Sequence, residues 1–334
     1  MKRKFLTVAM LVTMMAVATA CGDDEAGKTN NKKQEQYKGE EIPKGGKYVV
    51  KKTKKTLKAG TNMPEKPGTG DTFTYGDYIY TMGSDGWAVK VKVEDFATRT
   101  TFGEIEETVG GAPVLDLSEL FKGCGAMTES PVLPSTAVIL TKAFEGCTSL
   151  KTAPVLPESV TNMQYAFSEC KSLVKAPTIP DSVTSLTYTF NKCEALTEIP
   201  ILPASVTNLQ YTFNGCKSLV KAPAIPENVK SLNHTFSDCT SLTEAPVIPG
   251  KVMDMAGTFM NCSSLTTAPV IPESVKYVAD TFNSCTSLTG QVEFNCNPTE
   301  RAACFRNVDF KKQNLELTGT SNALDRLMQT GIYE

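Results

Sequence analysis

The sequence predicts a solenoid, a chain wound into short stacked coils rather than a globular domain built around one cleft. Its main signal is a phenylalanine that recurs every 23 residues, eight times from Phe121 to Phe282. Each phenylalanine is followed three residues later by a cysteine, from Cys124 to Cys285, and two further columns hold proline. A constant repeat of this length is the signature of a stacked repeat architecture. We therefore expect extended surfaces rather than one active-site pocket.

The apolar positions of each repeat are spaced unevenly. In the repeat that covers residues 144–166 they are Phe144, Cys147, Leu150, Leu156, Val160 and Met163. Neither the helical period of 3.6 nor the strand period of 2 produces these intervals. A coil with several corners does, with each apolar side chain pointing inward onto its equivalents above and below.

Prolines define two of these corners. Fourteen of the 19 prolines fall into two columns, one running from Pro131 to Pro269 and the other from Pro134 to Pro272. Proline lacks an N–H for a sheet ladder and is excluded from helix interiors, so both columns mark extended corners. The segment from Val160 to Ala166 and its equivalents are the best strand candidates, because they are rich in Val, Thr and Tyr. We expect them to form a parallel ribbon, with helix confined to short turns around Phe-x-x-Cys-x-x-Leu.

The repeat resembles the BspA-like leucine-rich-repeat family of bacterial surface proteins. The matching residues run from Ala166 to Leu173 (AFSECKSL) and from Ile179 to Leu186 (IPDSVTSL), and recur over residues 121–288. The resemblance implies a leucine-rich-repeat solenoid, mainly β, and a role in adhesion. One departure is Ala153-Pro154 and its equivalents, where the family usually has a β-branched residue. We expect this proline to weaken strand pairing in its column.

The flanks of the repeats read as caps, which solenoids need at their exposed ends. Residues 61–120 form the expected N-terminal cap, in which residues 72–93 predict a β-hairpin and Trp87 is expected to pack on the first coil. Residues 289–334 form the expected C-terminal cap, with a strand at 292–295 and a helix at 321–330.

The N-terminus reads as an export signal. Residues 1–20 combine a basic start, a short apolar stretch and small residues, as in a secretory signal peptide. The sequence up to Cys21 resembles a bacterial lipobox, which implies that Cys21 is lipidated; the alternative is ordinary cleavage before an unmodified cysteine. The acidic residues that follow resemble a surface-export signal of Bacteroidota-type lipoproteins. Residues 21–60 are rich in Lys, Glu, Gln, Gly and Asn and predict a disordered tether.

Composition argues against several classes of function. The chain has 34 basic and 36 acidic residues, so it lacks a polycationic face for nucleic acid. Its one histidine, His234, leaves little for a metal site or a nucleophile relay, and we expect neither enzymatic activity nor a cofactor. The repeat cysteines are expected to behave as small core residues, with disulfides between coils as the alternative. Cys296 and Cys304, beyond the last repeat, are a possible disulfide pair.

One column of the repeat holds three tyrosines and the histidine: Tyr165, Tyr188, Tyr211 and His234. On an exposed face it would suit contact with protein or carbohydrate, which makes it the candidate binding stripe. The alternative is an aromatic ladder that supports the coils.

Together these features predict a monomeric, non-catalytic leucine-rich-repeat lipoprotein on the surface of a bacterial outer membrane. It would touch the membrane through its N-terminal lipid alone and bind no nucleic acid. The family resemblance implies adhesion to host matrix proteins or other bacteria, with a protein or glycan as ligand. The alternative is a glycan-capturing lipoprotein of a nutrient-uptake system.

Overall fold

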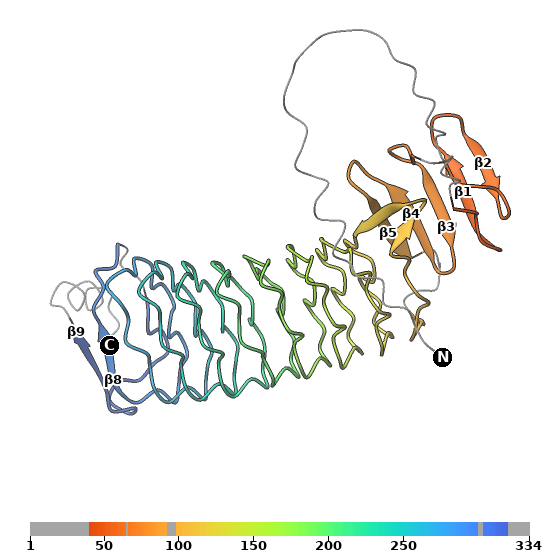
Figure 1. Ribbon diagram of the computed structural model, residues 1–334. Helices are drawn as coiled ribbons and strands as arrows, with labels where there is room; N and C mark the ends of the chain where they lie inside the picture. Colours follow the sequence, from red (N-terminus) through yellow and green to blue (C-terminus); the bar gives the residue numbers. More distant parts are fainter. Residues whose placement is uncertain (1–39, 65, 92–97, 300–302, 320–334) are drawn as a thin grey trace, which may run out of the picture. The chain divides into compact units, whose positions relative to one another are not determined.

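The computed structural model describes residues 40–64, 66–91, 98–299 and 303–319. Two kinds of structure follow one another along this chain. A β-sheet occupies the residues up to Asp116, and a stack of coils begins at Leu117 (Figure 1). The parts of the chain that the structure describes contain no α-helix, and thus none long and apolar enough to cross a membrane.

The sheet has seven strands in the order β2-β1-β3-β4-β5-β7-β6. Its strands are β1 (Lys47–Val50), β2 (Lys55–Lys58), β3 (Thr72–Tyr75), β4 (Tyr78–Met82), β5 (Trp87–Val91), β6 (Thr108–Val109) and β7 (Ala112–Asp116). Neighbouring strands are antiparallel except β5 and β7, which are parallel. The last residue of β7, Asp116, bridges to Ile139 in the next coil, so the sheet passes directly into the stack.

The prediction of a disordered tether over residues 21–60 is wrong for its second half, because β1 and β2 lie within it. The lysines of this segment are mostly exposed, but Tyr48 is fully buried and its hydroxyl donates to Asp71 Oδ2 at 2.8 Å. The backbone N–H of Lys51 donates to Asp71 Oδ1 at 2.9 Å. A few buried contacts to β3 and its neighbours therefore order a segment whose composition is that of a linker. Residues 21–39 lie outside the described part.

The hairpin predicted over residues 72–93 is instead a meander of three strands, β3, β4 and β5. Trp87, expected on the first coil, packs edge-to-face against Tyr48 and donates from Nε1 to the Val109 carbonyl at 2.9 Å. The first ring of the phenylalanine column, Phe121, meets Phe102 and Tyr78 instead, with ring centroids 4.9 and 6.5 Å away. The role of both flanks as caps stays a prediction.

Consecutive coils are joined by single-residue parallel bridges rather than by the predicted ribbon of strands. One column of bridges links Asp116, Ile139 and Asn162, and then Ser185 through Tyr277. A second column, which includes Thr152, Lys175 and Glu198, lies immediately before the Ala-Pro pairs, so proline does not abolish pairing there. The ribbon is cut short because the chain turns into the left-handed region at Tyr165 and its equivalents, three residues beyond the first bridge column. Around Phe-x-x-Cys-x-x-Leu the coil makes turns, such as Cys147 N–H to Phe144 O at 3.1 Å.

The interior of the stack consists of identical side chains in columns. The rings from Phe144 to Phe282 are fully buried and lie 5.2–5.9 Å apart between centroids, each stacked on the next. Every repeat thiol from Cys147 to Cys285 donates to the carbonyl of the phenylalanine 26 residues earlier, with Sγ–O distances of 3.0–3.3 Å. Burial raises the pKa of Cys285 to about 12, so the thiol stays protonated. The repeat cysteines are core residues.

At the end of the stack, β8 (Gly290–Phe294) pairs in parallel with β9 (Leu315–Gly319). The predicted strand at 292–295 overlaps β8, whereas the predicted helix at 321–330 lies outside the described residues. Cys296 and Cys304 are both buried, and a disulfide between them stays a prediction. Cys304 hydrogen-bonds to Thr281, and burial raises the pKa of both thiols, that of Cys296 to about 11.

The phenylalanine column predicts where the stack is most sensitive. Replacing Phe213 with alanine removes a ring held between Phe190 and Phe236, and we expect the free energy of unfolding to fall by about 3–5 kcal/mol. Ile201→Ala, at a side chain that is almost fully exposed, should change it by about 0.5 kcal/mol or less. Urea unfolding followed by circular dichroism measures both, and equal losses would show that the column does not hold the stack together.

Candidate binding surfaces

The candidate stripe forms one continuous stack of rings. Ring centroids lie 4.5 Å apart between Tyr165 and Tyr188, 4.5 Å between Tyr188 and Tyr211, and 4.7 Å between Tyr211 and His234. The planes of neighbouring rings are within 9° of parallel. All four side chains are half-buried, so their edges meet solvent. The sequence therefore placed these four residues together correctly.

The backbone explains why this column stacks so closely. Each of the four residues has a positive φ, between 49° and 58°. For a residue other than glycine this backbone conformation costs roughly 1–2 kcal/mol. Contact between aromatic rings contributes about 0.5–1.5 kcal/mol per pair and offsets much of that strain. The stack ends at Gly257, because glycine has no ring to continue it. The His234 ring fills the space next to this glycine, since a Cβ there would lie 2.5 Å from His234 Nε2.

The faces of these rings are not available to a ligand. Each inner face is covered by the next ring, Lys142 Nζ lies 5.5 Å from the Tyr165 centroid, and His234 lies over Gly257. A sugar ring recognises an aromatic side chain by lying on its face, so the stack offers no platform of that kind. What remains are ring edges and phenol hydroxyl groups. The ladder thus supports the coils, and its role in binding stays a prediction.

A second surface, which the sequence analysis missed, lies between the two proline columns. We call it the aliphatic ridge; its residues are Val132, Val155, Thr178, Ile201, Ala224, Val247 and Val270. Val132, Val155, Ile201 and Val247 are between 85 and 92 % exposed. Single exposed apolar side chains are ordinary, whereas a column that holds five large ones in seven coils is a candidate interaction surface.

The geometry of the corner forces the ridge outward. In the segment Pro131-Val132-Leu133-Pro134 the prolines favour an extended chain, in which neighbouring side chains point in opposite directions. Leu133 and its equivalents point into the core and are at most 7 % exposed, which leaves the preceding residue pointing to solvent. Two adjacent apolar residues between prolines were the signal in the sequence. Only the second of the two residues packs into the core of the coil.

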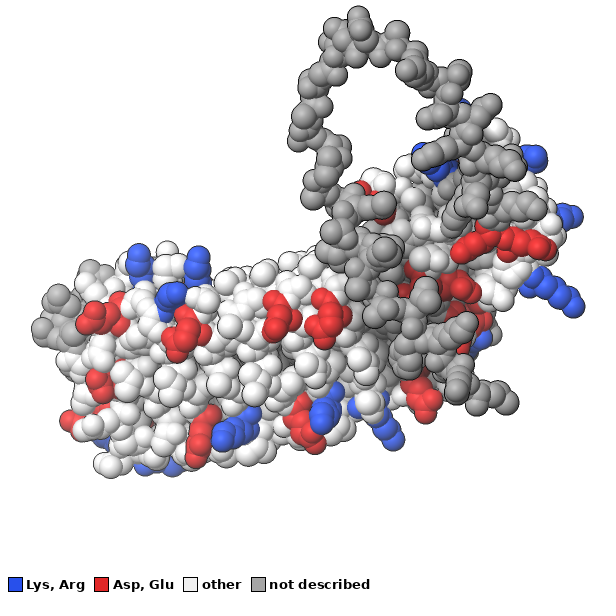
Figure 2. Space-filling view, in the orientation of Figure 1, with Lys and Arg blue, Asp and Glu red and all other residues white. Residues whose placement is uncertain are grey.

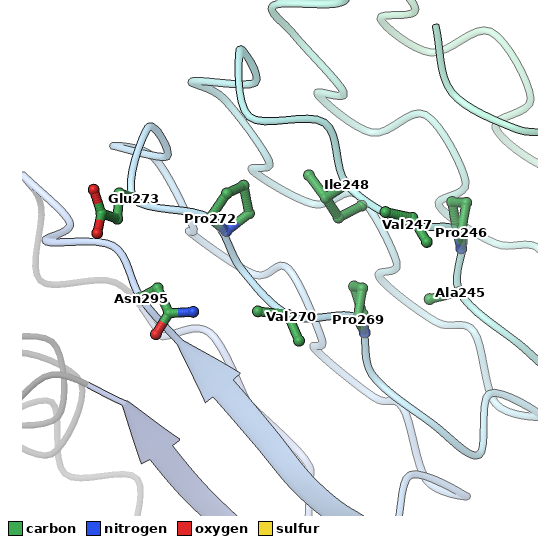
Figure 3. Close-up of a pocket in the computed structure, with 9 residues that line it drawn as sticks. All are labelled: Ala245, Pro246, Val247, Ile248, Pro269, Val270, Pro272, Glu273 and Asn295. Carbon is green, nitrogen blue, oxygen red and sulfur yellow. The ribbon is translucent and has the colours of Figure 1, made fainter. Parts of the chain in front are cut away.

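The ridge borders a groove between the last coils. The groove has a volume of about 410 Å³ and apolar walls that include Pro246, Val247, Pro269 and Val270. Glu273 and Asn295 lie together at one end of it, away from Pro246 and Ala245 (Figure 3).

Charge is distributed unevenly around the coils. Figure 2 shows an uncharged band along the stack between two rows of charged side chains. On other columns, lysines of adjacent coils pair with the carboxylates Glu145, Glu169, Glu194 and Glu198, at distances of 2.9–4.0 Å. The column that follows the second proline carries Glu158, Asp181, Glu227 and Glu273, all exposed, and none makes an ion pair with a described residue.

The described residues hold no group of three or more His, Cys, Asp or Glu side chains placed to bind a metal ion.

Comparison with known proteins identifies the repeat. The sequence matches the family described as BspA type leucine rich repeat region, with six copies over residues 117–243 and 210–321. Together these matches span more than half of the chain. The chain belongs to the BspA-type leucine-rich-repeat family. Leucine-rich-repeat proteins of this kind are typically non-catalytic and generally bind other proteins.

Several solved structures are similar to this BspA-type chain. A leucine-rich-repeat protein of T. pallidum is 26% identical with a TM-score of 0.49, covering 57% of this chain and 88% of its own. One from Bacteroides ovatus is 17% identical with a TM-score of 0.32, covering 78% and 97%. A leucine-rich cell surface protein from Faecalibacterium prausnitzii is 18% identical with a TM-score of 0.31, covering 77% and 97%. No curated protein matches the sequence.

The strained aromatic column predicts an unusual order of stabilities. Tyr188→Ala loses the stack but keeps a Cβ at a φ of 56°, whereas Tyr188→Gly loses the stack and relieves the strain. We expect the glycine variant to be about 1 kcal/mol more stable than the alanine variant, the reverse of the usual effect of glycine. Urea unfolding of both proteins measures the difference. An alanine variant as stable as the wild type would mean that stacking contributes nothing.

His234 predicts how stability depends on pH. Burial lowers the pKa of its imidazole, against the opposing effect of Asp254, Asp280 and Asp238. Below the unfolded-state pKa of about 6.5 the unfolded chain binds the proton more readily, so this contribution to stability is present at pH 7 and lost as pH falls. The free energy of unfolding should decrease more between pH 7 and pH 5 in the wild type than in His234→Tyr, which keeps the ring stack. Parallel pH profiles would contradict this assignment.

Proposed function

We propose that this protein is a non-catalytic adhesin-like binding protein, displayed on a bacterial surface, that binds a protein partner through the aliphatic ridge. The observation that carries the proposal is the column of exposed, mostly aliphatic side chains at one position of the coils. Burying such side chains against a partner gains about 25 cal/mol per Å² of apolar surface. The typical role of leucine-rich-repeat proteins in binding other proteins supports the same conclusion.

The ridge suits a protein partner better than a glycan. Aliphatic side chains flanked by buried and half-buried prolines offer apolar contact but few hydrogen-bonding groups, whereas sugars need many. The aromatic column, the other candidate, has its ring faces covered by neighbouring side chains. We therefore favour adhesion to a protein over capture of a glycan.

Attachment through Cys21 is part of the proposal and rests on the sequence alone. The first described residue is Glu40, and the 19 residues that separate it from Cys21 reach at most about 65 Å when fully extended. A lipid at Cys21 would therefore hold the folded part close to the membrane.

Whole cells that express the full-length chain test this function. We expect intact cells to capture purified extracellular-matrix proteins in a form that resists about 0.5 M NaCl, because apolar contacts are not screened by salt. Val155→Ser combined with Ile201→Ser should reduce capture at least tenfold, while Cys21→Ala should remove the protein from the cell surface.

Tyr188→Gly, which alters the aromatic column and leaves the ridge intact, serves as the matched control and should capture normally. Capture of glycans but not proteins would favour the alternative function. Undiminished capture by the ridge variant would overturn the assignment of the surface.

A further inference from the structure

The aliphatic ridge and the unpaired carboxylates beside it form one composite surface. Glu158 and Asp181 follow the ridge positions Val155 and Thr178 by three residues, across the second proline. The two carboxylates occupy the same position in adjacent coils, which in a parallel stack lie roughly 4.8 Å apart. Like charges in register on neighbouring chains are destabilising. Several carboxylates elsewhere in this stack pair with lysine, as Glu169 does with Lys192 at 2.9 Å.

No basic residue is close in sequence to this pair. Lysine and arginine are absent from the five residues on either side of both Glu158 and Asp181. Further along the stack Lys230 and Lys276 follow Glu227 and Glu273 by three residues, so the net negative character is concentrated near Glu158 and Asp181. Both side chains are exposed and neither makes an ion pair with a described residue, so a basic side chain of a partner can pair with them.

Building on the proposed function, we propose that the occupant of this surface is an amphipathic α-helix of a partner protein, with lysine or arginine beside its aliphatic stripe. The ridge and the carboxylate row run parallel along the stack, so the occupant needs an apolar row and a basic row side by side. An α-helix presents such rows, and its pitch of about 5.4 Å is close to the spacing of the coils. Aliphatic side chains at i, i+3, i+4 and i+7 span about 10.5 Å, roughly two coil intervals, and the next turn of the helix continues the contact along the ridge.

The groove near the end of the stack fits the same chemistry. Its apolar walls accept the methylene stem of a lysine or arginine, whose charged end then reaches Glu273 and Asn295. A partner helix long enough to follow the ridge meets a second acidic position there.

A defined peptide tests the inference. The probe is an 18-residue helical peptide of leucine and lysine with leucine at i, i+3, i+4 and i+7, labelled for fluorescence anisotropy against the full chain. We expect it to bind, and to bind at least tenfold more weakly when glutamate replaces its lysines or when the same residues are scrambled. Glu158→Gln combined with Asp181→Asn, and separately Val155→Ser combined with Ile201→Ser, should each weaken binding at least tenfold.

The matched control is Glu169→Gln combined with Glu194→Gln, which removes the same charge from carboxylates that already pair with lysine. It should change affinity less than twofold, and circular dichroism checks that every variant is folded. An equal effect of the control would reduce the binding to general electrostatic attraction and overturn the proposal. Concentration-dependent dimers that are lost in the ridge variant would identify a second copy as the occupant and also overturn it.

The two proposals fail in distinguishable ways. If cells still capture a protein through the ridge while Glu158→Gln with Asp181→Asn has no effect on either capture or the peptide, the proposed function stands and the basic helix is wrong. If the ridge variants bind both the peptide and the matrix proteins normally, both are wrong.

Discussion

Every structural feature of the stack depends on one constraint, the contact of each residue with its equivalents 23 positions before and after it. The constraint is enforced from inside by the phenylalanine rings, which leave no room for a coil to slide. It makes each column a chemically uniform environment. A side chain that is favourable once is favourable in every coil, and one that is unfavourable recurs in the same way.

Buried carbonyl groups in the interior accept hydrogen bonds from side chains in addition to those from backbone N–H groups of the turns. The repeat thiols donate to the phenylalanine carbonyls, and Thr189, Thr212, Thr235, Thr258 and Thr281 donate to buried carbonyls 26 residues earlier at 2.8–3.0 Å. A carbonyl oxygen has two lone pairs, and the side-chain donor occupies the one that the backbone N–H leaves open. Cysteine and threonine thus combine small size with a donor, which explains columns that would otherwise be filled by alanine or valine.

The sequence was informative about columns and less so about backbone conformation. Period and chemistry were enough to place Phe144, Cys147 and Leu150 in the core and to bring Tyr165 next to Tyr188. The predicted ribbon of strands was wrong. Tyrosine favours strands, but the backbone of this fold turns to a positive φ two residues before each repeat phenylalanine, which is where the tyrosines lie. The prediction of a disordered tether was wrong in its second half for a related reason. The contact that orders this segment joins Tyr48 to Asp71, which is 23 residues away in the sequence. The ridge was not predicted because a pair of prolines marks a corner but does not fix which of the two residues between them points into the core.

The 23-residue register also has a consequence for the size of the protein. Removing or adding 23 residues anywhere within the stack restores every column, whereas a single inserted residue misaligns all columns of its coil. Length can therefore change in whole steps without redesign of the core. Each added coil lengthens the ridge by one contact position. Duplication of a repeat therefore extends the surface that can contact a long partner, without any change to the existing coils.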